Sequence, residues 1–139
     1  MKRLAAKALI TSYGVVEYPV ITIDDGRIVR IANGNEETVD RVDYEFSDCM
    51  LTAGFLDIHF HGIAGHDVMN ASMEGLGDVA RRLAGAGICR FLPTTVTAAL
   101  DDTLTALENM ATFIEAGTVD GGAQAAGIHI EGPFLSHGK

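Results

Sequence analysis

The segment Gly54-Phe55-Leu56-Asp57-Ile58-His59-Phe60-His61-Gly62 carries two imidazoles at the end of an apolar run. The run has the composition of a buried strand, in which residues two apart point to the same face and lie about 6.5 to 7 Å apart. His59 and His61 therefore share one face of the predicted strand. Both can reach one metal ion, and the glycine that follows lets backbone approach a ligand closely.

A second apolar run, Gly127-Ile128-His129-Ile130-Glu131-Gly132-Pro133-Phe134, repeats this spacing with His129 and Glu131. A carboxylate at the mouth of a buried strand is costly unless a cation lies beside it, so Glu131 favours a metal site shared with His59 and His61. Without a metal, the carboxylate would need an arginine or a helix end, and the histidines would be hydrogen-bonded core residues. His129 lies one layer deeper and is interpreted as a core residue or as one that orients a ligand.

Composition limits the partners that the protein can have. The chain has 139 residues, 47% hydrophobic, and a mean hydropathy of +0.20, which is enough to bury a core in one or two domains. Nineteen acidic residues against ten basic ones give a net charge of −9, which opposes binding to nucleic acid or to an anionic membrane. Cys49 and Cys89 are interpreted as free thiols in a reducing compartment, so we expect a cytoplasmic protein.

Residues 1–52 have the composition of a small all-β domain of short antiparallel strands. Asp24-Asp25-Gly26 predicts a hairpin, and Gly34-Asn35 predicts another turn. The strands are expected at 9–11, 15–17, 20–23, 28–31 and 39–46.

Residues 53–139 alternate apolar runs with amphipathic stretches, which is typical of a parallel α/β sheet with helical crossovers. The order is βαβαβ, and after the third strand one edge of the sheet would lie open. The sequence is therefore expected to be a fragment of a longer fold. Strands are predicted at 55–60, 88–92 and 126–130, and helices at 73–86 and 101–116.

Other chemistries are poorly supported by the motifs. Gly62-Ile63-Ala64-Gly65 has the glycines of a phosphate-binding loop, but it lacks the Lys-Ser/Thr of a P-loop and the spacing of a dinucleotide site, so nucleotide binding is discarded. No Gly-X-Ser-X-Gly nucleophile motif occurs. His66 and His137 are flanked by glycines and are interpreted as solvated loop residues.

The segments at 51–62 and 127–134, with Phe91-Leu92-Pro93-Thr94-Thr95 between them, resemble the N-acetylglucosamine-6-phosphate deacetylases of the amidohydrolase superfamily. The resemblance covers essentially the whole chain. It implies an α/β fold in which residues 53–139 supply the first β/α units of an incomplete (β/α)8 metal-dependent hydrolase barrel. Residues 1–52 would be the N-terminal part of a small β-sandwich domain.

The resemblance also implies the chemistry. In the family, the residue matching Glu131 is a metal ligand, and a first-strand pair such as His59 and His61 makes a second metal position possible. The metal polarises the acetamide carbonyl and activates water, and an aspartate from the last barrel strand transfers the proton, which yields glucosamine 6-phosphate and acetate. That aspartate lies outside these residues, so the fragment alone is expected to be inactive. Zinc is expected, with iron, manganese or cobalt as alternatives, in a homodimer that binds a small sugar phosphate.

Two alternatives stay open at this point. Another amidohydrolase, such as a cyclic amidase or an N-acyl amino acid deacylase, would share the His-X-His pair, although Glu131-Gly132-Pro133-Phe134 argues against it. From a different class, the chain could be a short metal-binding module that pairs its open sheet edge with a partner. The sequence does not decide between N-acetylglucosamine and N-acetylgalactosamine 6-phosphate as substrate.

Overall fold

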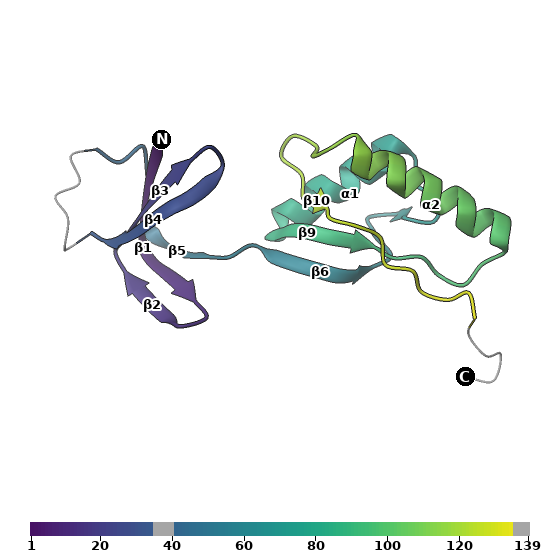
Figure 1. The fold of residues 1–139 in the computed structure, drawn as a ribbon, viewed down its shortest axis with the longest axis horizontal. Helices are drawn as coiled ribbons and strands as arrows, with labels where there is room; N and C mark the ends of the chain where they lie inside the picture. The colour runs from purple at the N-terminus through teal and green to yellow at the C-terminus, as the bar shows by residue number, and fades with distance from the viewer. Residues whose placement is uncertain (35–40, 135–139) are drawn as a thin grey trace. The chain divides into compact units, whose positions relative to one another are not determined.

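A computed structural model describes residues 1–34 and 41–134 of the chain. The chain divides into two compact units, Met1–Ala53 and Gly54–Lys139 (Figure 1). In its described part the first unit is built from strands, whereas the second unit combines strands with helices. The start of the strand predicted at 39–46 and the predicted loop residue His137 lie outside the described residues.

The first unit is one sheet of five strands arranged around the long strand β1 (Lys2–Thr11). β2 (Gly14–Glu17) and β3 (Pro19–Asp24) pair antiparallel with the C-terminal and N-terminal halves of β1. β4 (Arg27–Asn33) continues the sheet beyond β3, and β5 (Tyr44–Thr52) pairs with β1 in parallel. The predicted strand at 9–11 is therefore only the end of β1, because pairing with β3 and β5 extends that strand to Lys2.

The hairpin predicted at Asp24-Asp25-Gly26 is confirmed. Asp25 and Gly26 have φ values of 46° and 70°, the left-handed conformations that a two-residue hairpin loop needs. The prediction at 39–46 is wrong in position and in direction, because the observed strand runs from Tyr44 to Thr52 and is parallel to its neighbour. Its start is set by pairing with β1, and the local alternation of apolar and charged residues does not encode that pairing.

The second unit contains a parallel sheet with β9 (Ile88–Pro93) at its centre. β6 (Phe55–Phe60) lies on one side of β9 and β10 (Gln124–Ala125) on the other. The segment expected to be a loop after β6 instead forms a short hairpin of β7 (Gly62–Ile63) and β8 (His66–Asp67). The strand predictions at 55–60 and 88–92 are confirmed to within one residue.

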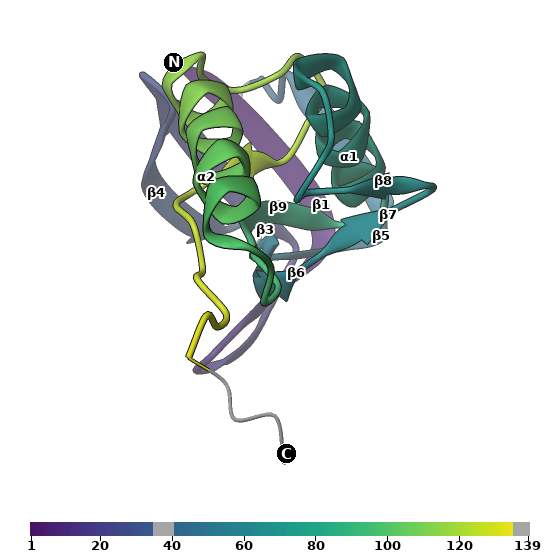
Figure 2. The ribbon, with the colours of Figure 1, turned by 90° about the vertical axis from the view of Figure 1, so that its right-hand side faces the viewer.

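Two helices cover one face of this sheet, as Figure 2 shows for α1 (Met73–Gly85) and α2 (Leu100–Glu115). The Ser72 hydroxyl caps α1 by accepting a hydrogen bond from the Gly75 N–H at 3.1 Å. Gly87, at φ 83°, follows the end of α1 in the left-handed conformation typical of helix termini. Both helix predictions are confirmed to within one residue. Among the described residues, neither helix combines the length and the apolar character that a membrane span requires.

The core of the second unit lies between the helices and the sheet. Phe60 and Phe91 meet there edge to face, with ring centroids 5.7 Å apart at an angle of 76°. Because successive side chains of a strand alternate between faces, the burial of Phe60 under the helices turns His59 and His61 to the opposite face of the sheet. The helices bury Leu76, Val79, Leu83, Ala106, Met110 and Phe113 against this face.

The strand predicted at 126–130 is wrong, because the regular ladder ends at Ala125 and only a single bridge joins His129 to Thr94. The Ala126 N–H donates to the Phe91 carbonyl at 2.9 Å, but the Pro93 carbonyl accepts from His129 at 3.1 Å. The two hydrogen bonds are thus three residues apart on this segment, from 126 to 129, but only two residues apart on β9, from 91 to 93. One extra residue in the segment breaks the ladder, as in a β-bulge.

The helix packing predicts a large cost for Leu76→Ala, because Leu76 is 1% exposed in the core of the second unit. We expect the free energy of unfolding to fall by about 2 to 5 kcal/mol. The matched change Leu104→Ala lies on α2 at a side chain that is 49% exposed and should cost less than about 1 kcal/mol. Urea denaturation followed by circular dichroism measures both variants. Equal losses for the two variants would contradict the assignment of the core.

Candidate metal centre

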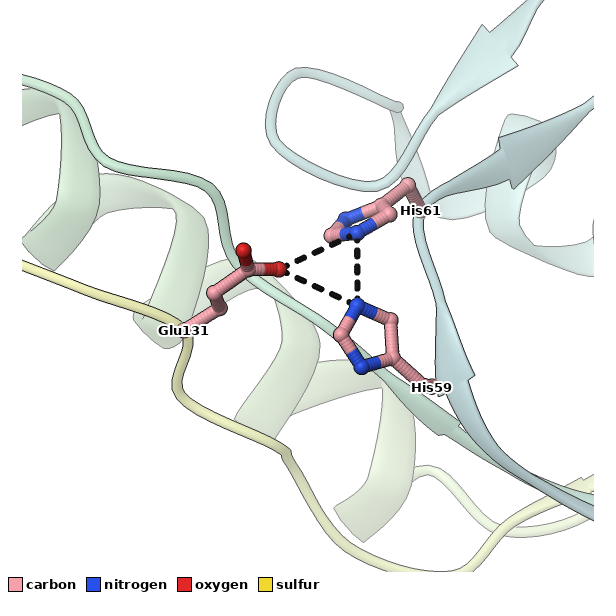
Figure 3. Close-up of side chains that lie close together, drawn as sticks. All are labelled: His59, His61 and Glu131. Carbon is pink, nitrogen blue, oxygen red and sulfur yellow. Dashed lines mark hydrogen bonds and ion pairs between the residues drawn. The ribbon is translucent and has the colours of Figure 1, made fainter. Parts of the chain in front are cut away.

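Three side chains from distant parts of the second unit meet at one point. His59 is on β6, His61 directly follows that strand, and Glu131 lies past the irregular segment beside β9 (Figure 3). The Glu131 Oε2 atom is 3.0 Å from His59 Nε2 and 3.2 Å from His61 Nε2. The two Nε2 atoms are 2.9 Å apart. We call His59, His61 and Glu131 the ligand triangle.

The ligand triangle fits a divalent metal ion. Its sides are short enough for one ion to lie about 2.0 to 2.2 Å from all three atoms, the usual length of bonds from zinc to imidazole nitrogen and carboxylate oxygen. Two imidazoles and a carboxylate suit zinc, iron, manganese and cobalt alike. The three side chains are 47%, 40% and 38% exposed, so the triangle can accept further ligands.

The His61 ring is oriented by a hydrogen bond on the side away from the triangle. Its Nδ1 atom lies 3.1 Å from the Thr94 carbonyl oxygen. A carbonyl only accepts hydrogen bonds, so Nδ1 carries the proton of the neutral ring and Nε2 presents a lone pair to the triangle. This is the tautomer that a metal ligand needs.

His129 lies beside the ligand triangle and is not one of its corners. Its Nδ1 atom is 3.1 Å from the Ile58 carbonyl oxygen, to which it donates a hydrogen bond. Its ring meets the His59 ring edge to face, with centroids 4.9 Å apart at 89°. His129 is half-buried, and its contact with His59 is compatible with a role in orienting that ligand, which stays a prediction.

A hollow of about 460 Å³ opens beside the triangle. It is lined by His61 and by the β7–β8 hairpin, residues 62–67. His66, predicted to be a solvated loop residue, is half-buried in this lining, with Nε2 3.9 Å from Asp78 Oδ2. The hollow gives a small molecule room next to one of the three ligands.

The sequence analysis assigns no role at the site to Thr94 and Thr95, which are fully buried at the end of β9. Thr94 supplies the carbonyl that orients His61, and the Thr95 hydroxyl bonds to the backbone of Glu131. Their role could have been suspected from the sequence, because two adjacent hydroxyl residues follow a buried apolar strand, where polar groups need hydrogen-bond partners.

The chain matches no protein-family model. The N-acetylglucosamine-6-phosphate deacetylase of Bacillus subtilis (strain 168) is 34% identical over 131 residues, which cover 93% of this chain and 33% of that protein. The N-acetylgalactosamine-6-phosphate deacetylase of Escherichia coli O157:H7 is 35% identical over 133 residues, which cover 96% of this chain and 33% of that protein.

A solved structure agrees with these relatives. A mutant of N-acetyl-D-glucosamine-6-phosphate deacetylase from Mycobacterium smegmatis, in complex with N-acetyl-D-glucosamine-6-phosphate, matches with a TM-score of 0.82 and 25% identity. The match covers 97% of this chain and 33% of that one. This chain thus spans about a third of the length of the proteins it matches. It is a mixed α/β homologue of the N-acetylglucosamine-6-phosphate deacetylases, which are hydrolases, and resembles their N-terminal part.

Proposed function

We propose that the ligand triangle is part of the metal site of an amino-sugar-phosphate deacetylase that acts on N-acetylglucosamine 6-phosphate. The observation that carries this proposal is the convergence of His59, His61 and Glu131 within 3.2 Å of one another. The similarity to deacetylases over 93% of the chain supports the reaction class. The activity belongs to the complete gene product, because the chain spans about a third of its relatives.

Each residue of the triangle has a definite part in the proposal. His59 and His61 offer neutral imidazole nitrogens, and Glu131 offers the negative charge that offsets a divalent cation. When bound, such an ion supplies Lewis-acid chemistry, which polarises an amide carbonyl and activates water. The proton-transferring aspartate and further ligands implied by the family resemblance would come from the remainder of the barrel.

The hollow beside His61 is a candidate position for part of the substrate. Its lining contains two histidines and an aspartate but no lysine or arginine, so it lacks the fork of donors that binds a phosphate. The phosphate group would therefore be bound by residues elsewhere in the complete protein. A homodimer, a cytoplasmic location and zinc as the resident ion stay predictions.

N-acetylgalactosamine 6-phosphate is the second candidate substrate. The relative that carries its name is 35% identical to this chain, against 34% for the Bacillus subtilis relative. The similarity to two sugar-phosphate deacetylases does not favour a cyclic amidase, an N-acyl amino acid deacylase or a short metal-binding module.

An acetate-release assay on the complete gene product tests the proposed reaction. We expect kcat/KM for N-acetylglucosamine 6-phosphate to exceed that for N-acetylgalactosamine 6-phosphate by about 10-fold or more, the scale that contacts to one hydroxyl provide. N-acetyl amino acids and cyclic amides serve as controls. Faster turnover of either control class would contradict the proposal.

Glu131→Gln tests the ligand triangle. The change keeps the shape of the side chain but removes its charge, so metal retained after dialysis should fall to about a tenth or less, and turnover should fall with it. Metal content is measured by inductively coupled plasma mass spectrometry. Glu115→Gln, at an exposed carboxylate on α2, is the matched control and should retain all of the metal.

The two histidines should behave differently from Glu131. His59→Ala and His61→Ala are each expected to remove only the metal held by the first strand, so that an enzyme with two ions keeps one. Complete retention of metal after Glu131→Gln would show that the carboxylate is not a ligand.

A further inference from the structure

We propose that Thr94 and Thr95 act together as positioning residues that fix His61 and Glu131 at the spacing a metal ion requires. This inference rests on the proposed metal site. The two threonines are adjacent at the end of β9, and both are fully buried. Thr94 contacts His61, and Thr95 contacts Glu131.

Thr95 fixes the backbone of Glu131 with a single hydroxyl group. Its Oγ1 accepts a hydrogen bond from the Glu131 N–H at 3.0 Å and donates one to the Glu131 carbonyl at 3.1 Å. The Thr95 N–H also donates to the His129 carbonyl at 3.0 Å. Glu131 lies beyond the last bridge of the sheet, so the hydroxyl replaces the ladder hydrogen bonds that would otherwise fix its position.

Thr94 fixes the two histidines through hydrogen bonds to the end of β6 and to the His61 ring. Its Oγ1 accepts a hydrogen bond from the Phe60 N–H at 2.9 Å, midway between His59 and His61 in the sequence, and donates one to the Leu92 carbonyl at 2.9 Å. Its carbonyl oxygen accepts a hydrogen bond from His61 Nδ1 at 3.1 Å. The position of Phe60 and the orientation of the His61 ring thus depend on the same threonine.

Because Thr94 and Thr95 are adjacent in the chain, the position of His61 is coupled to the position of the Glu131 backbone. One peptide bond separates the group that orients His61 from the group that fixes the Glu131 backbone, so moving these two positions apart would break hydrogen bonds that are partly buried. A buried N–H that loses its acceptor costs more than the net contribution of the hydrogen bond, because it is also separated from water. The Glu131 backbone is therefore costly to move away from His61, which limits the positions that its carboxylate can reach.

Thr103 provides a matched control for the loss of a buried hydroxyl. Like Thr95 it is buried in the second unit, but its Oγ1 donates to the Ala99 carbonyl at 3.0 Å within α2. Its hydroxyl group bonds within its own helix and not to the ligand triangle. Thr103→Val therefore tests the general effect on stability that accompanies such a change.

The test titrates the metal-free complete gene product with Zn²⁺ by calorimetry and records the visible absorption of its Co²⁺ form. We expect Thr95→Val to weaken Zn²⁺ binding by about 10- to 100-fold and to alter the Co²⁺ spectrum. Thr95→Ser retains the hydroxyl and should stay within about 3-fold of the unmodified protein. Thr103→Val should lower the melting temperature and leave Zn²⁺ affinity unchanged.

Thr94→Val is the second variant, in case Thr95→Val does not fold. It loses the acceptor for Phe60 N–H and keeps the carbonyl for His61, so we expect a smaller loss of Zn²⁺ affinity. A folded Thr95→Val or Thr94→Val protein with unchanged Zn²⁺ affinity and Co²⁺ spectrum would overturn the inference and leave the proposed function standing. An unmodified protein that binds no Zn²⁺ would overturn the proposed function and this inference with it.

Discussion

One extra residue between Ala126 and His129 determines which face of the sheet receives Glu131. Ala125 packs in the core under the helices, so strict alternation from it would direct residues 127, 129 and 131 to the same face. The shift of the hydrogen bond at Pro93 from residue 128 to His129 inverts that alternation. Glu131 therefore lies on the face of His59, and the ligand triangle depends on this irregularity.

The inverted alternation places the Glu131 carboxylate next to two imidazole rings. A neutral His61 uses its only ring proton at the Thr94 carbonyl, so its Nε2 offers a lone pair to the Glu131 carboxylate 3.2 Å away. Two acceptors at that distance need a positive charge between them, either a second proton on the ring or a cation. A second ring proton would give a histidine–carboxylate ion pair, whereas a cation would give the proposed metal site.

Much of the second unit could be predicted because its signals are local. The periodicity of α1, the Ser72 cap and the run of apolar residues in β6 are each contained within a few neighbouring positions. The shared face of His59 and His61 follows from a period of two. The parallel pairing of β5 with β1 and the extra residue before His129 depend on strand partners distant in sequence, and no local pattern encodes them. The role of Thr95 was missed for the same reason, because its partner Glu131 lies 36 residues away.

The two relatives bear on the role that is proposed for the ligand triangle. The chain matches a deacetylase of N-acetylglucosamine 6-phosphate and one of N-acetylgalactosamine 6-phosphate almost equally, at 34% and 35% identity. The two sugars carry the same acetamide group and differ in the orientation of one hydroxyl. Residues that contact the reacting amide would be under the same requirements in both enzymes, whereas residues that contact the hydroxyl would not. Under the proposed function, a ligand triangle dedicated to the amide is compatible with both relatives, and selection between the sugars would depend on side chains outside the triangle.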